Sequence, residues 1–145
     1  MRQARAIEFS TVVKVTIPSD FAASRDVQKA ILDEVVRCNY DEGSVFGIKL
    51  ALEEGMINAI KHGNRFDATK KVHVEYTVTP KQVEIAIEDE GPGFDPCCVP
   101  DPTLEENLEK CSGRGILLIG AYMTRVEYQK GGRRLHMVKV NERAE

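Results

Sequence analysis

One stretch of the sequence, residues 45–64, has the spacing of a helix with two different faces. Its apolar side chains recur every three or four residues and predict a buried face made of Val45, Ile48, Leu52, Met56 and Ala59. The opposite side carries Glu54, Asn58 and Lys61, and apolar residues border this polar stripe on both edges. A carboxylate and an amide one turn apart in such surroundings indicate either the lining of a pocket or a partly solvated helix face.

Composition limits the chain to one soluble domain. A length of 145 residues with 42% hydrophobic and 30% charged residues is typical of a single globular unit over residues 1–145. The net charge of −3 provides no basic surface for nucleic acid. We find no signal peptide and no membrane-spanning run, so the sequence predicts a cytoplasmic protein without direct membrane contact. The four cysteines lack metal-site spacing and are predicted to be free thiols.

Periodicity and turn signals predict an α+β order of elements. In sequence, we expect a strand at 13–17, helices at about 21–38 and 44–62, a hairpin at 72–78 and 83–87, a helix at 116–122, and strands at 125–129 and 133–140. Helices between hairpin strands favour a two-layer sandwich, with the helices on one face of a mixed, mostly antiparallel sheet. The irregular segment at about 95–112 is long enough to be a lid.

Asp89 stands out because of its parity in the second hairpin strand. Val83, Ile85 and Ile87 alternate, and two residues further on Asp89 falls on the side that buries them. A carboxylate on the core side is costly unless donors surround it, and a bound ligand is one such donor. The alternative is that the strand has already ended and Asp89 belongs to the turn before Gly91.

A second candidate feature is the Gly113-Arg114-Gly115 turn that opens a predicted helix. Free backbone N–H groups and the helix dipole favour an anion there, and glycine lets a phosphate approach closely. The Arg114 side chain either adds a charge-assisted contact or faces solvent. Gly-x-Gly turns are common, so this feature indicates a phosphate site only in combination with the others.

These features suit the parts of a nucleotide. The Asp89 carboxylate can accept a hydrogen bond from an exocyclic amine such as that of adenine, and Gly91 and Gly93 let the ring edge come close. Asn58 offers a side-chain oxygen of the kind that Mg²⁺ binds. Glu54 can orient or deprotonate an attacking hydroxyl or water.

Two further side chains, Lys61 and His62, either reach a phosphate or lie on the surface.

Three segments resemble, in order and spacing, the motifs of the GHKL ATPase/kinase superfamily. They are an N box, Glu54-x-x-x-Asn58-Ala-Ile-Lys61-His62-Gly, a first glycine box, Asp89-Glu-Gly91-Pro-Gly93-Phe94, and a second, Gly113-Arg114-Gly115-Ile116-Leu-Leu-Ile. The resemblance covers about residues 10–140 and implies an α+β sandwich that holds ATP under a mobile lid between the two glycine boxes.

Within that superfamily the chain most resembles the anti-sigma-factor serine kinases of bacteria. The resemblance implies binding of ATP with Mg²⁺, phosphorylation of a serine or threonine on an anti-sigma-factor antagonist, and sequestration of a sigma factor, often by a homodimer. It assigns Glu54 as general base, Asn58 as Mg²⁺ ligand and Asp89 as adenine reader. The remaining nucleotide-binding residues that it implies are Lys61, His62, Gly91, Gly93, Phe94, Gly113, Arg114, Gly115 and Ile116.

One departure from the family pattern leaves alternatives open. Members of the family commonly carry a Gly-Thr-Thr-like segment in the last hairpin, where a threonine supports the adenine-binding aspartate. Here the segment is Gly132-Arg133-Arg134, which has no hydroxyl. The sequence is therefore also compatible with a nucleotide-gated partner-binding module that has no kinase activity. A detached histidine-kinase catalytic domain is a further alternative.

Overall fold

A five-stranded sheet and a layer of helices form the part of the chain that the computed structural model describes, residues 11–93 and 118–143. The strand order is β1-β2-β3-β5-β4, with β1 at Val13–Pro18, β2 at Lys71–Val78, β3 at Gln82–Glu88, β4 at Arg125–Gln129 and β5 at Arg134–Val140. The predicted lid and the predicted site residues Phe94, Gly113, Arg114, Gly115 and Ile116 lie outside the described residues.

Every pairing between these strands is antiparallel. The predicted α+β class is confirmed. We predicted a mixed, mostly antiparallel sheet, and each described pairing is antiparallel. The connection from β1 to β2 runs up one helix and down the next, so the chain re-enters the sheet in the opposite direction. The hairpins that join β2 to β3 and β4 to β5 reverse the chain in the same way.

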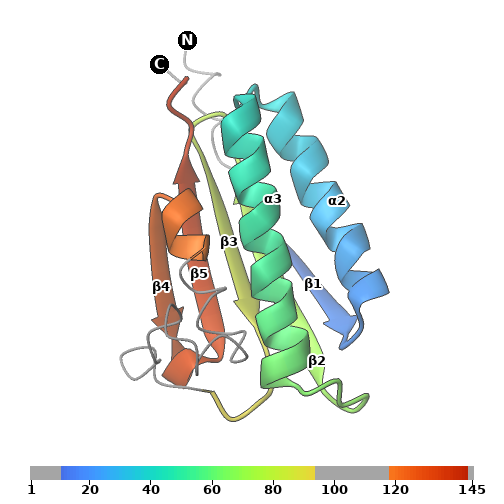
Figure 1. The fold of residues 1–145 in the computed structure, drawn as a ribbon. Coiled ribbons are helices and arrows are strands. Elements are labelled where there is room, and N and C mark those ends of the chain that lie inside the picture. Colours follow the sequence, from blue (N-terminus) through green and yellow to red (C-terminus); the bar gives the residue numbers. More distant parts are fainter. Residues whose placement is uncertain (1–10, 94–117, 144–145) are drawn as a thin grey trace.

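The two long helices, α2 at Phe21–Arg37 and α3 at Glu42–Ile57, lie side by side over one face of the sheet (Figure 1). Each begins at an aspartate whose side chain accepts a hydrogen bond from a free backbone N–H of the first turn. Asp20 accepts from Ala23 at 2.8 Å, and Asp41 accepts from Ser44 at 3.3 Å. None of the helices in the described ranges is long and apolar enough to cross a membrane.

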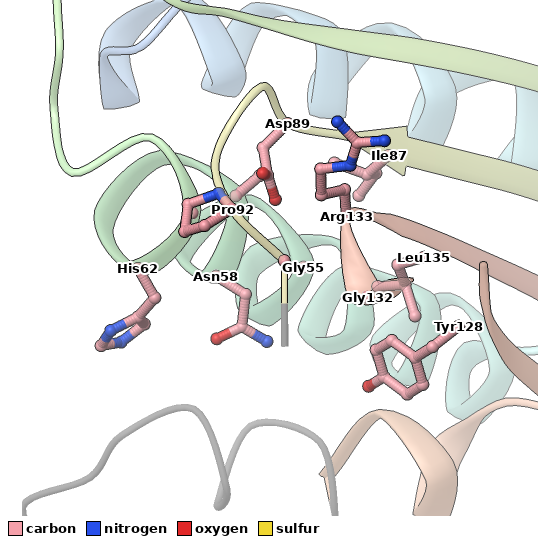
Figure 2. A pocket seen from close by; sticks show the side chains of 13 residues that line it. Gly55, Asn58, His62, Ile87, Asp89, Pro92, Tyr128, Gly132, Arg133 and Leu135 are labelled. Carbon is pink, nitrogen blue, oxygen red and sulfur yellow. The ribbon is translucent and has the colours of Figure 1, made fainter. Parts of the chain in front are cut away.

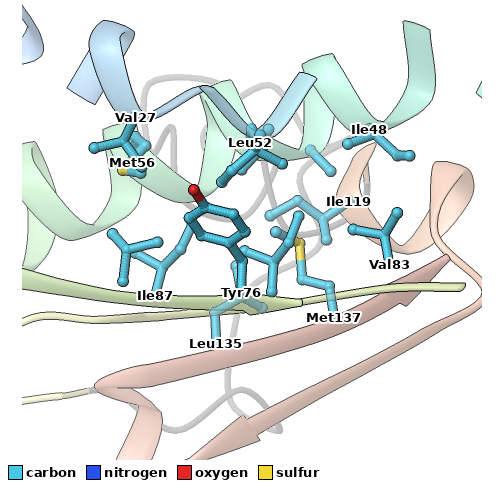
Figure 3. Packing of buried hydrophobic residues seen from close by; sticks show 14 of the residues in the cluster. Val27, Ile48, Leu52, Met56, Tyr76, Val83, Ile87, Ile119, Leu135 and Met137 are labelled. Carbon is cyan, nitrogen blue, oxygen red and sulfur yellow. The ribbon is translucent and has the colours of Figure 1, made fainter. Parts of the chain in front are cut away.

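The core lies between α3 and the central strands (Figure 3). Ile48, Leu52 and Met56 are fully buried on the face of α3 that the sequence predicts. They pack over Ile87 of β3 and Met137 of β5, which are equally buried. The helical spacing and the strand alternation therefore predict the same contact surface from opposite sides.

The helix does not keep α-helical geometry to its end. Its last six residues, Asn58–Gly63, form a π-helix, η1, in which the N–H of Asn64 donates to the carbonyl of Ala59 at 2.8 Å. The predicted end near His62 is thus right in extent, but the type of helix differs. Short π-helical turns are frequent at functional sites because they re-aim side chains. Apolar spacing alone does not reveal such a turn.

Candidate functional site

A cavity of about 200 Å³ opens where the end of the helix layer meets the ends of β3 and β5 (Figure 2). On the helix side its walls are Gly55, Asn58 and His62, and on the sheet side they include Ile87 and Asp89. Asn58, one of the three residues of the predicted polar stripe, therefore faces a real hollow. Of the two interpretations of that stripe, the pocket lining is the one that the structure shows for Asn58.

Asp89 is the buried carboxylate of this cavity. It follows β3 directly and is 9% exposed, on the core side as its parity predicts. Its Oδ1 accepts a hydrogen bond from the N–H of Gly91 at 2.8 Å. Burial raises the pKa of the Asp89 carboxyl above its ordinary value, while this N–H and the positive charges of Arg133 and Lys70 act in the opposite direction. The carboxylate thus has room for a further donor from the cavity.

Glycines let the end of η1 and the turn after β3 touch through their backbones. A Cβ on Gly63 would collide with the Asp89 carboxylate, and a Cβ on Gly91 would collide with the Gly63 carbonyl. Gly93 has a φ of 83°, and a Cβ there would meet the Gly131 carbonyl. The glycines predicted to allow close approach of a ligand therefore also bring the two walls of the cavity together.

Asn58 and His62 lie on the helix wall. Burial, followed by the charge of Lys61, lowers the pKa of the His62 imidazole below its ordinary value. The Nε2 atom of His62 is buried, and no hydrogen-bond partner for it exists among residues 11–93 and 118–143. A neutral imidazole and a half-buried amide thus line the cavity opposite Asp89, and both can contact a polar ligand.

The other predicted residues of this helix are placed differently. Glu54 is half-buried one turn before Asn58, but the walls of the cavity as described do not include it. Lys61 and Glu53 line a separate groove between α2 and α3. The structure therefore brings Asn58, His62, Asp89 and Gly93 together, and it does not bring Lys61 to them.

The far wall consists of residues from the last hairpin. Sequence reasoning linked Gly132 and Arg133 to the surroundings of Asp89 through the family resemblance, and it did not assign Tyr128 or Leu135 to the site. Tyr128 of β4 and Leu135 of β5 line the cavity, together with Gly132 and Arg133. Burial raises the pKa of Tyr128 to about 12, so its hydroxyl stays protonated. The alternation of β5 contained the signal, because Leu135 and Met137 mark the core side. Counting back by two from Leu135 places Arg133 on the same side.

Arg133 and Arg134 occupy opposite sides of the sheet. Arg133 runs beside Asp89 in Figure 2, and its Nε donates to the Lys130 carbonyl at 3.2 Å. Arg134 points to the other face, where its guanidinium lies 3.3 Å from Glu88 and 3.4 Å from Glu75. Only Arg133 therefore takes part in the cavity.

This α+β domain thus holds a binding cavity, with one buried carboxylate, between its helices and the ends of its strands. The family model of the histidine kinase-like ATPase domain matches residues 17–139, and the chain belongs to this family. The resemblance to the GHKL superfamily that the three motifs indicate is confirmed.

Relatives and solved structures extend the comparison. The anti-sigma F factors of three Clostridium perfringens strains are 32% identical to the chain over 83 residues. The match covers 55% of this chain and 59% of each relative, so the chain spans less than two thirds of their length. A crystal structure of the RsbU and RsbW domains of a Mycobacterium tuberculosis protein has the same fold, with a TM-score of 0.59 at 14% identity. The match covers 90% of this chain and 31% of the Mycobacterium tuberculosis chain.

Proposed function

We propose that this protein binds ATP with Mg²⁺ and is a protein serine/threonine kinase that acts as an anti-sigma factor. Its substrate would be a serine or threonine of an anti-sigma-factor antagonist, and its second partner a sigma factor. The observation that carries the proposal is the buried Asp89 carboxylate facing Asn58 and His62 across the cavity. Family membership and the likeness to anti-sigma F factors support it. A homodimer and a cytoplasmic location stay predictions.

Asp89 is suited to read the base. One of its oxygens is occupied by the Gly91 N–H, which fixes the orientation of the carboxylate. The remaining capacity can accept the exocyclic amine of adenine, and a hydrogen bond to a charged acceptor contributes about 1.5–3 kcal/mol. A base with a carbonyl oxygen at this position would place a hydrogen-bond acceptor against the carboxylate, which is also an acceptor, so the two would repel each other. The site therefore selects an amino-substituted ring.

The residues present fit Mg²⁺ as a companion of the phosphates. No cluster of three or more His, Cys, Asp or Glu side chains suited to a metal exists within the described ranges. Mg²⁺ needs no such cluster, because it takes one or two protein oxygens and fills its octahedron with waters and phosphate oxygens. Asn58 would supply the protein oxygen. The ion, when bound, neutralises charge on the phosphates.

Glu54 would act as general base. In the proposed reaction the substrate hydroxyl oxygen forms a bond to the γ-phosphorus, the bond from that phosphorus to ADP breaks, and the hydroxyl proton passes to the Glu54 carboxylate. Glu54 is half-buried and lies one turn from Asn58, so a protein substrate at the cavity mouth would meet it next to the phosphates.

A pair of neighbouring glutamates gives a matched test of the reaction. Phosphotransfer from radiolabelled ATP to an antagonist encoded beside the gene is expected to be lost in Glu54→Ala, while ATP binding measured by calorimetry persists. Glu53→Ala removes the same charge from the α2–α3 groove instead and is expected to retain transfer. Full transfer by Glu54→Ala would show that the assigned base is wrong.

A nucleotide-gated binding module without kinase activity is the second candidate. Two observations favour it. The cavity walls as described do not include Glu54, and Arg133 lies beside Asp89, where the family resemblance implies a threonine hydroxyl. Calorimetry with ATP and with ADP, run beside the transfer assay, separates the two. Tight binding of ATP with no transfer to any antagonist supports the module.

A further inference from the structure

Asn64, the residue that follows η1, is the most completely bonded polar side chain near the cavity. It is 1% exposed. Its Oδ1 accepts from the backbone N–H of Glu90 at 2.8 Å, and its Nδ2 donates to Ser19 Oγ and to the Lys71 carbonyl, both at 2.9 Å. The amide therefore joins the start of the helix layer, the start of β2 and the turn after β3.

The turn after β3 depends on this amide. Three consecutive backbone N–H groups are held there: Asp89 donates to the Arg133 carbonyl at 3.0 Å, Glu90 donates to Asn64, and Gly91 donates to the Asp89 carboxylate. The first bond ties the turn to β5, and the third is internal to the turn. Of these three bonds, only the one to Asn64 ties the turn to the helix side of the cavity. The Glu90 side chain separately joins the turn to β2, through the Lys71 N–H and His73.

We propose that Asn64 is a positioning residue for base recognition, acting through the Asp89 turn without touching the ligand. This inference rests on the proposed function, because it takes Asp89 as the group that reads the base. Asn64 directly follows η1, so one segment forms a cavity wall and also fixes the carboxylate on the opposite wall. Without the amide, the N–H of Glu90 and the carbonyl of Lys71 lose this partner, and the turn loses this tie to the helix layer.

The second arm of the same amide offers a matched control. Ser19 Oγ receives the Nδ2 donor and itself donates to the Lys70 carbonyl at 2.7 Å, and it makes no bond to the turn after β3 in the described residues. Ser19→Ala therefore disrupts the same buried network but leaves the bond from Asn64 to Glu90 in place. A purely structural role of Asn64 would give the two variants the same binding behaviour.

The test compares ATP with the purine ribonucleoside triphosphate that lacks the 6-amino group. Wild type is expected to prefer ATP by about tenfold or more, the equivalent of one hydrogen bond to a charged group. The preference should fall below about threefold in Asn64→Ala and stay at the wild-type value in Ser19→Ala. Full preference in folded Asn64→Ala overturns the proposal. A wild type that binds neither triphosphate contradicts the proposed function instead.

Amide hydrogen exchange of the nucleotide-free wild type provides a second measurement, which does not require the variant to fold. The Glu90 N–H is expected to exchange as slowly as the paired amides of β2 and β3. If it exchanges as fast as an exposed loop amide, Asn64 does not hold the turn and the proposal fails.

Discussion

The α3 and η1 parts of one helical segment contact the sheet through different chemistry. In α3, Leu52 and Met56 fill the space above the strands with apolar side chains. Around η1 the contact is made by the backbones of Gly63 and Gly91 and by the buried amide of Asn64, and a cavity remains beside it. The apolar end stabilises the fold by burying apolar surface, whereas the polar end replaces side-chain packing with backbone contacts around the buried Asp89 carboxylate.

The largest effect is expected from truncating the apolar end. Leu52→Ala leaves a cavity under a fully buried side chain and should lower the free energy of unfolding by about 2–5 kcal/mol. Because Leu52 does not line the binding cavity, the folded protein should retain its ATP affinity. Urea denaturation and titration with a fluorescent ATP analogue measure the two quantities. A change in ATP affinity without a loss of stability would contradict the claim that Leu52 serves the fold and not the cavity.

At the polar end, one methyl group should change both quantities. Gly63→Ala places a Cβ against the Asp89 carboxylate, and overpacking of this kind costs about 1–3 kcal/mol. The carboxylate must move, so ATP affinity should fall together with stability. Gly120→Ala is the matched control, since a Cβ there meets nothing within 4 Å. Equal behaviour of the two variants would contradict the close approach at Gly63.

Asp89→Asn should move stability and affinity in opposite directions. The amide oxygen still accepts from Gly91, but the loss of charge should weaken ATP binding by about 10- to 100-fold. Because burial raises the folded pKa of Asp89, the ionised form destabilises the ligand-free protein as the pH rises through that pKa. The variant should therefore be more stable than wild type at pH 7. That advantage should shrink as the pH falls to the ordinary carboxyl pKa of about 3.9 and vanish about one pH unit lower, where the aspartate is neutral in both states. Urea denaturation of both proteins across this pH range measures the difference in stability. An Asp89→Asn variant that is less stable than wild type at pH 7 would contradict the prediction.

The smallest effect separates the two adjacent arginines. The charge of Arg133 lowers the pKa of Asp89, so Arg133→Thr should raise that pKa further. Arg134→Thr removes the contacts with Glu88 and Glu75 on the other face of the sheet and should leave the titration of Asp89 close to wild type. Carbon-detected NMR titration of the Asp89 carboxyl distinguishes them. Equal shifts of the Asp89 pKa in both variants would contradict the assignment of the two arginines to opposite faces of the sheet.

Much of this architecture is predictable from the sequence because periodicity reports burial. The spacing of Ile48, Leu52 and Met56 and the alternation through Ile87 specify both sides of the core. The parity of Asp89 places the carboxylate correctly, even though β3 ends one residue before it. For Asp89 both interpretations thus hold in part, since it begins the turn and still faces the core side.

The rest depends on long-range contacts that no local pattern contains. Tyr128 reaches the cavity because β4 pairs with β5 and β5 pairs with β3, which brings the last hairpin beside Asp89. The sequence presents Asn64 as a helix stop, and its three side-chain bonds involve partners up to 45 residues away in the chain. The lid and the second glycine box stay predictions, as they lie outside the described residues.

The π-helical turn makes the protein sensitive to chain length at this point. A turn closed by i→i+5 bonds holds one residue more than an α-helical turn. Deletion of one residue within 58–63 should therefore restore α geometry and remove the widened turn that lines the cavity, while the residues beyond it keep their direction. An added residue has no such local compensation and should rotate each following side chain by about 100°, which would take Asn64 out of its network.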